Sequence, residues 1–251
     1  MKLAGVFVKW SRYINPTDRR DDTYGTCIFG DYVAVVGEVG YNFPDLNVGR
    51  PYVALLRRSD GRVVKEIIGN RLGDSITALS IDGKLYTVGY TYVGVSYKYI
   101  YVYDANLNTL KEVSGRESSE YYSLTYDGRA LYVGGSIRKD LDGDGDPEKV
   151  WLVEKRDLNT LGLVESREIY FGSWREGWMN DIGVESSTGR IWTVGYHDNH
   201  SLIVVLGRDL EILKVIVYPE DSEGCLGPLY GVTFDGSNIR LRLRRQGCRQ
   251  V

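Results

Sequence analysis

The chain has 251 residues, of which 43% are hydrophobic and 26% are charged, and its formal net charge is −3. So small a charge excludes a general electrostatic attraction to nucleic acid or anionic lipid, and no run of about 18 apolar residues predicts a transmembrane helix. Thirty glycines, six prolines and twenty tyrosines without a Gly-X-Y period exclude collagen. They favour an all-β chain, because glycine serves turns and aromatic residues favour strands.

One strand phrase recurs along the chain. The sequence LYTVGY at 85–90 is nearly repeated as IWTVGY at 191–196. Weaker copies are VAVVG at 33–37, LYVGG at 131–135 and IRLRL at 239–243. The copies recur about every 50 residues, a period typical of propeller blades rather than of helical repeats.

Each copy lies within a predicted four-stranded meander. A strand and a tight turn precede it, most clearly at the Asp-Gly pairs 82–83, 127–128 and 235–236, and Asp-Gly is a strong hairpin signal. An alternating strand and a short outer strand follow it. The units span about 23–68, 75–113, 121–169 and 179–218, and a fifth begins at about 229.

The fifth unit has two strands before the chain ends, and the segment 3–14 has the character of a third strand. We therefore predict an all-β, five-bladed β-propeller of four-stranded antiparallel blades in a single domain, 1–251. Its last blade combines 229–251 with 3–14, which closes the ring and removes an open sheet edge. Two small β-sandwiches are the structural alternative.

The cysteines and the N-terminus bear on the compartment. Cys27, Cys225 and Cys248 have no metal-ligand spacing and do not form a secreted disulfide framework, although pairing of Cys225 with Cys248 stays open. The first ten residues resemble no signal sequence, which predicts a cytoplasmic chain. An extracellular location stays open if the chain is a mature fragment. Two His and two Met beside many charged residues fit a protein from a hyperthermophile.

An acidic loop at 140–148, reading DLDGDGDPE, carries the most specific chemistry in the sequence. Calcium takes six to eight oxygen ligands, and carboxylates at loop positions 1, 3 and 5 can wrap it together with later ligands. Five residues fit such a site: the carboxylates of Asp140, Asp142, Asp144 and Glu148, and the backbone carbonyl of Asp146. An EF-hand is excluded, because its twelfth position would be Trp151 and no helices flank the loop. The sequence therefore predicts a structural Ca²⁺, with an exposed acidic turn as the alternative.

The acidic loop resembles the calcium loops of FG-GAP repeats in integrin-alpha-type propellers. That resemblance covers about nine residues, and Glu148 replaces the usual aspartate. In that family the loop joins the first two strands of a blade, whereas here we expect it between the second and third. The Val-Gly-Tyr phrase is also loosely similar to bacterial and archaeal propeller repeats.

The starts of the inner strands are expected to line one mouth of the central channel. Alignment by the turn acids predicts a column of Cys27, Ala78, Ser123, Asp181 and Gly231, preceded by Thr26, Thr77, Tyr122, Asn180 and Tyr230. The candidate ligand-binding residues are aromatic or acidic: Trp174, Trp178, Asp181, Tyr122, Tyr230, Asp74, Glu120 and Asp22. Sugars stack on aromatic rings and bond carboxylates through their hydroxyls, so a carbohydrate is the specific hypothesis.

Two other groups leave alternatives open. Arg240, Arg242 and Arg244 alternate on the last predicted strand, either paired with carboxylates of a neighbouring blade or exposed to an anion or partner. His197 and His200 are spaced as a metal pair, but a surface turn is the favoured interpretation.

The sequence thus favours a non-enzymatic binding or scaffold propeller, directed at a glycan or another protein and acting as a monomer. A glycoside hydrolase of the five-bladed arabinanase-like type is the alternative, because Asp22, Asp74, Glu120 and Asp181 could supply its carboxylates. A protein-docking platform is the second alternative.

Overall fold

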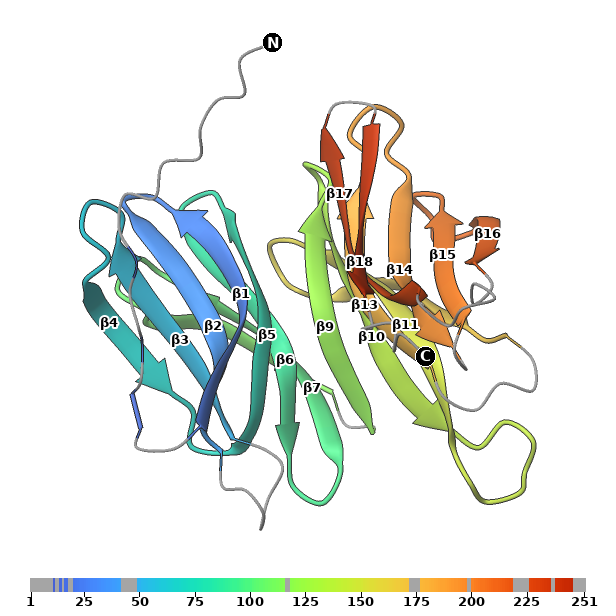
Figure 1. The fold of residues 1–251 in the computed structure, drawn as a ribbon, viewed down its shortest axis with the longest axis horizontal. Coiled ribbons are helices and arrows are strands. Elements are labelled where there is room, and N and C mark those ends of the chain that lie inside the picture. The colour runs from blue at the N-terminus through green and yellow to red at the C-terminus, as the bar shows by residue number, and fades with distance from the viewer. Residues whose placement is uncertain are drawn as a thin grey trace, which may run out of the picture. The chain divides into compact units, whose positions relative to one another are not determined.

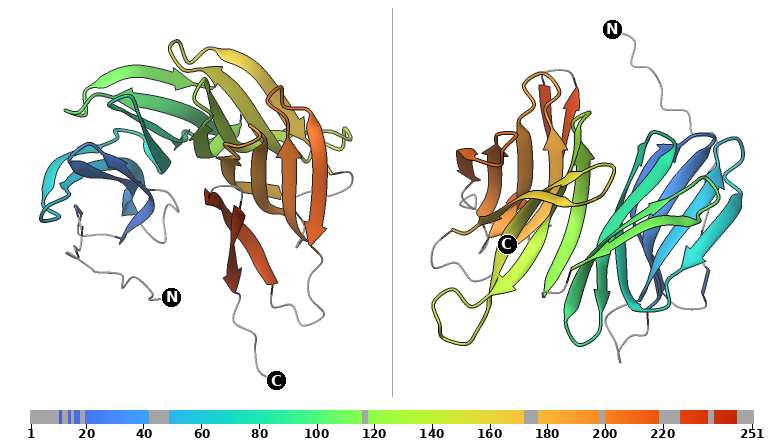
Figure 2. Two further views of the ribbon diagram at one scale, coloured as in Figure 1. Left: turned by 90° about the horizontal axis from the view of Figure 1, so that it is seen from above. Right: turned by 180° about the vertical axis from the view of Figure 1, so that it is seen from behind.

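The computed structural model describes residues 11, 14, 16–17, 20–41, 49–115, 118–171, 177–197, 200–218, 226–235 and 238–245. Its regular elements in these ranges are eighteen β-strands in five antiparallel sheets, four with four strands and one with two (Figures 1 and 2). No helix long and apolar enough to cross a membrane occurs among them. The predicted fold class is confirmed, because these are the sheets expected of a five-bladed propeller.

The contacts divide the chain into two compact units. One comprises 1–87, 91–93 and 100–112, and the other comprises 88–90, 94–99 and 113–251. Of the segment 3–14 that was expected to complete the last blade, the structure describes only residues 11 and 14, so closure of that blade stays a prediction. Trp174, Cys225 and Cys248 lie outside the described ranges.

The first sheet has the order β1-β2-β3-β4, and the second has the order β5-β6-β7-β8. The strands of the first are β1(Arg20–Phe29), β2(Tyr32–Tyr41), β3(Arg50–Arg57) and β4(Val63–Ile68). Those of the second are β5(Leu72–Ile81), β6(Lys84–Tyr92), β7(Ser96–Tyr103) and β8(Thr109–Ser114). Phe29, Val36, Leu55, Ala78 and Leu85 are among the buried side chains that pack these sheets together. The turn between β5 and β6 has positive φ at both Asp82 and Gly83, as a two-residue hairpin turn requires.

The second unit contains the other three sheets. The third has the order β9-β10-β11-β12, the fourth β13-β14-β15-β16, and the fifth is the hairpin β17-β18. The third comprises β9(Ser119–Tyr126), β10(Ala130–Lys139), β11(Glu148–Asp157) and β12(Leu163–Ile169). The fourth comprises β13(Gly177–Val184), β14(Ile191–His197), β15(His200–Leu206) and β16(Ile212–Tyr218), and the hairpin comprises β17(Leu226–Asp235) and β18(Asn238–Arg245). Two apolar layers hold them together, one around Trp151 and Met179 and one around Val194 and Val232.

The structure explains why glycine recurs in the strand phrase. A side chain at Gly37, Gly135 or Gly195 would place its Cβ within about 2 Å of a backbone carbonyl oxygen of the neighbouring strand. In all three sheets this neighbouring strand bulges at the same place, where one residue is left out of the pairing. The recurring glycine therefore makes room for a bulged inner strand. Leu243 holds this position in the last sheet, whose pairing is shifted twice nearby.

The bulges also correct the predicted alignment of the first blade. Val36 pairs with Gly25, as Gly134 pairs with Ser123 and Val194 with Asp181. The column therefore contains Gly25 rather than Cys27, and the residue before it is Tyr24 rather than Thr26. The turn acid misled the alignment, because Phe29 pairs with Tyr32 and Asp31 is the second residue of that turn.

Candidate functional site

The bulged residues of the inner strands carry related side chains. They are Tyr24 on β1, Tyr122 on β9, Asn180 on β13 and Tyr230 on β17. A bulge re-aims the side chain of its extra residue, and bulges are frequent beside functional sites. Tyr24 and Tyr230 are 46% and 39% exposed, whereas Tyr122 and Asn180 are half-buried.

In the second unit, a buried lysine organises the start of β9 and β13. The Lys149 ammonium lies 3.0 Å from a carboxylate oxygen of Glu120, 5.4 Å from the Tyr122 ring centre and 4.4 Å from the Trp178 ring centre. Glu120 also accepts hydrogen bonds from the Tyr122 hydroxyl and, at 2.8 Å, from the Ser96 hydroxyl. Burial alone would raise the pKa of Glu120, but the attraction of Lys149 and these donors hold it below its usual value. Lys149 was missed in the sequence, because its role depends on which face of β11 turns inward.

The ring of Trp178, a candidate stacking surface for a sugar, already contacts two other side chains. Tyr196 stacks on it with ring centres 5.1 Å apart, and the Lys149 ammonium lies over it. These contacts take up much of the ring surface on which a sugar would stack. Among the described candidate aromatics, Tyr230 therefore offers the most exposed ring.

Asp181 joins the inner strands of three sheets. Its carboxylate accepts hydrogen bonds from the Ser123 hydroxyl of β9 at 2.6 Å, the Ile182 amide at 2.9 Å and the Val232 amide of β17 at 2.9 Å. Burial raises the pKa of Asp181, and these donors offset only part of that effect. Asp181 is thus a bridge between sheets as well as a site candidate.

Asp22 and Asp74 lie in the first unit, around Tyr24. The Tyr24 hydroxyl donates a 2.6 Å hydrogen bond to Glu38, which pairs with Asp22 across β1 and β2. Burial, the hydrogen bond to Glu38 and the charges of Asp74, Glu38 and Asp22 all raise the pKa of Tyr24. Glu38 was missed in the sequence, although it directly follows the recurring glycine at Gly37. These acids surround a tyrosine, and the described residues nearby include no metal-binding group.

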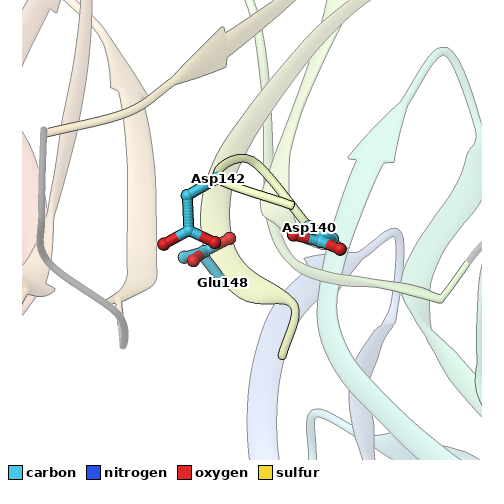
Figure 3. A group of neighbouring side chains, drawn as sticks. All are labelled: Asp140, Asp142 and Glu148. Atoms are coloured by element: carbon cyan, nitrogen blue, oxygen red, sulfur yellow. The ribbon is translucent and has the colours of Figure 1, made fainter. Parts of the chain in front are cut away.

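The acidic loop joins β10 to β11, the second and third strands of its sheet, as predicted. Oxygen atoms of Asp140, Asp142 and Glu148 lie within 4.8 Å of one another (Figure 3). Two oxygens that bind one Ca²⁺ at 2.3–2.6 Å can be no more than about 5.2 Å apart, so this spacing fits a shared ion. Asp144 and Asp146 are not part of this group. Gly143 and Gly145 have φ of 81° and 85°, which fits the tight turns of the loop.

Glu148 makes the loop unusual among exposed acidic turns. It is only 4% exposed and accepts a 2.9 Å hydrogen bond from the Leu141 amide. A buried carboxylate is costly without a positive partner. Two lysines lie near Glu148, Lys139 opposite it in the pairing of β10 with β11 and Lys149 next to it in the sequence, but each binds another carboxylate. Lys139 bonds Glu168 at 2.7 Å, and Lys149 bonds Glu120. A cation shared with Asp140 and Asp142 would supply the missing charge.

The structure contradicts one expectation from the sequence and favours one of two alternatives that the sequence left open. His197 is fully buried, with its ring edge-on to Phe171 at 5.6 Å, because the strand β14 extends to it; it is not part of a surface turn. Arg240 and Arg242 are exposed, and Arg240 forms an ion pair with Asp235 of its own hairpin, because β18 follows β17 directly. This favours the exposed alternative for that strand. The side chain of Arg244 lies outside the described part of the chain.

Comparisons with known proteins add little. No protein-family model and no curated protein match the chain. Among solved structures it is similar to a subtype N10 neuraminidase-like protein of A/little yellow-shouldered bat/Guatemala/060/2010, with a TM-score of 0.47 and 10% identity over 77% of this chain. The match covers 65% of that protein, less than two thirds of its length. It is also similar to the WD40 repeats of RRP9, with a TM-score of 0.45 and 12% identity over 85% of this chain and 69% of that one. At these TM-scores we infer nothing about ligand or activity.

Proposed function

We propose that the chain is a non-enzymatic binding protein whose loop 140–148 holds a structural Ca²⁺. The observation that carries this proposal is the approach of Asp140, Asp142 and buried Glu148 within 4.8 Å. The likeness of the loop to FG-GAP calcium loops supports it. The ion would stiffen the β10–β11 connection and stabilise the folded chain, because a ligand that binds only the folded state adds to its stability.

Calorimetric titration with Ca²⁺ tests the metal site. We expect one binding event in the wild type and a loss of at least about 100-fold in affinity in Asp142→Asn and Glu148→Gln, because carboxylate charge sets the affinity of such loops. Saturation at about 100 times the dissociation constant is expected to stabilise the wild type by about 2.7 kcal/mol.

Asp146→Asn is the matched control for the calcium titration. Its backbone carbonyl is the expected ligand, and its carboxylate lies outside the group of three. This variant is therefore expected to keep binding within about tenfold of the wild type. Absence of heat in the wild type, or equal loss in Asp146→Asn, contradicts the proposed site.

We propose that a glycan binds at the inner strands of the second unit, with the ring of Tyr230 on β17 as its stacking surface. Tyr230 is 39% exposed at a bulge, and its neighbour Leu229 accepts a 2.7 Å hydrogen bond from the Asn180 side chain. An exposed ring on a fixed backbone suits the apolar face of a sugar. Another protein is the alternative partner.

Glycan-array binding tests the proposed ligand. Tyr230→Ala is expected to lose at least about tenfold in affinity for a glycan that the wild type binds. Tyr170→Ala is the control, because Tyr170 is similarly exposed, at 42%, at the end of β12. A wild type that binds no glycan, or a matching loss in Tyr170→Ala, argues against this surface.

A glycoside hydrolase is the second candidate. The pKa of Glu120 lies below its usual value and that of Asp181 above it, which are the directions of a base and an acid. Both carboxylates, however, are engaged by several donors within the chain. Hydrolysis of arabinan or xylan that is lost in Asp181→Asn would favour this candidate over a binding protein.

A further inference from the structure

The four-stranded sheets each end in an outer strand, β4, β8, β12 or β16, which has one neighbour among the described strands. Such an edge leaves a row of backbone N–H and C=O groups unpaired, and natural proteins protect edges with charged side chains. The four outer strands can be compared position by position. A residue with positive φ precedes each of them, namely Gly61, Leu107, Leu161 and Leu210.

The pairing of each outer strand with the third strand of its sheet shows which of their residues are equivalent. Glu66 pairs with Ala54, Ser166 with Glu154 and Val215 with Val204, each after a single irregularity in the ladder. Two residues later come Ile68, Glu168 and Val217. In β8 the same count from the turn reaches Glu112 and Ser114. At these two equivalent positions, each of the other outer strands has at least one Glu or Ser. The strand β16 has valine at both.

The outer strand β16 consequently exposes more apolar surface than the others. Its exposed large hydrophobic residues, each 40% to 48% exposed, are Ile212, Leu213, Val215, Val217 and Tyr218. The exposed large hydrophobic residues of the other outer strands are fewer: Val64 in β4, Leu110 in β8, and Leu163 and Val164 in β12. The single charged residue of β16 is Lys214. An exposed, apolar edge strand is a site for pairing with another strand.

We propose that β16 is a dimer interface, where it pairs antiparallel with β16 of a second copy of this chain. The strand is complementary to itself: with Val215 opposite Val215 of the second copy, Leu213 faces Val217 and Lys214 faces Ile216. The single charge thus meets no like charge, and both edges satisfy their backbone groups. Two-fold pairing of one surface with itself is the commonest arrangement of homodimers. A net charge of −3 per copy opposes it only weakly.

A reversible dimer would replace the monomer expected from the sequence. Strand pairing alone buries less surface than a large obligate interface, so we expect an affinity in the micromolar range. A peptide strand of another protein would also fit an open edge, but the second copy is favoured because self-pairing leaves Lys214 without a like charge opposite it.

Sedimentation equilibrium of the full chain over a range of concentrations tests the interface. The wild type is expected to form dimers reversibly. Val215→Glu combined with Val217→Glu places like charges at the two-fold axis and is expected to weaken dimerisation at least about 100-fold. Glutamate stands at the corresponding positions of other outer strands, as Glu66, Glu112 and Glu168, so the variant is expected to fold, which its thermal unfolding checks.

Val64→Glu on β4 is the matched control, because Val64 is 46% exposed on another outer strand. It is expected to dimerise like the wild type. A wild type that stays monomeric at all concentrations overturns the proposal. That result is the one expected if β16 binds a peptide of another protein instead. Dimers that persist in the double variant, or that dissociate in the control, overturn it as well.

Discussion

Replacing Glu154 by glutamine is expected to lower the free energy of unfolding by about 3–5 kcal/mol. Glu154 is 3% exposed, and its carboxylate binds the Lys98 ammonium at 2.6 Å and the Arg156 guanidinium at 2.8 Å. The Tyr121 hydroxyl also donates to it. The glutamine side chain has nearly the same shape but no charge, so two cations, Lys98 on β7 and Arg156 on β11, would remain without their counter-ion. Denaturant unfolding measures the loss.

Glu168→Gln is the matched control for this substitution. Glu168 lies in the same sheet and binds Lys139 at 2.7 Å, but both side chains are 40% exposed. An exposed ion pair contributes about 0.2–1 kcal/mol, so the control is expected to lose no more than that. Equal losses in the two variants would show that burial of Glu154 does not set its contribution.

The pH dependence of stability gives a second readout of Glu154. Burial tends to raise the pKa of Glu154, but Lys98 and Arg156 outweigh burial and hold it below its usual value in the folded chain. A glutamate whose pKa is lower in the folded chain than in the unfolded chain stabilises the fold at pH values above its unfolded pKa of about 4.3. This stabilisation is lost as the pH falls through the pKa of the folded chain. The difference in stability between wild type and Glu154→Gln is therefore expected to be constant from about pH 6 to 8 and to shrink below about pH 4. A difference that grows on acidification would contradict the assignment.

The sequence was informative where a local pattern decides the structure. The recurring phrase predicted the second strand of every sheet, and the acidic loop was placed correctly between β10 and β11. Three of its carboxylates come together because consecutive turns bring them there, which spacing alone can predict. The alignment of the first blade failed, because it counted back from the turn acid Asp31, which is the second residue of its turn and not an equivalent reference point.

Long-range partners were beyond the reach of the sequence. Glu154 and Lys98 are 56 residues apart, and Ser123 and Asp181 are 58 residues apart. Such contacts depend on how two neighbouring sheets pack, and a single sequence gives no measure of that. The burial of His197 was missed for the same reason, because it depends on packing such as the contact with Phe171. Its polar sequence neighbours Asp198 and Asn199 had suggested a surface turn.

Replacing Gly195 by alanine is expected to destabilise the chain by about 3 kcal/mol, at the upper end of the usual cost of overpacking. The new Cβ would lie 2.0 Å from the backbone oxygen of Trp178 and 2.9 Å from the Cα of Met179. Neither atom can rotate away, so β13 and its bulge would have to shift. Thermal and denaturant unfolding measure the effect.

Gly162→Ala is the control for Gly195→Ala, because its nearest neighbour is a side-chain oxygen of Thr160 at 3.1 Å in an exposed turn. It is expected to change stability by less than about 1 kcal/mol. If Gly195→Ala were equally mild, the close approach of the bulged strand could not be the reason for the recurring glycine. If it is severe, the same constraint applies to Gly37 and Gly135, whose new side chains would meet backbone oxygens at 2.0 and 1.9 Å. The repeat would then be maintained by the geometry of the bulge, which also sets the aim of Tyr24, Tyr122 and Asn180.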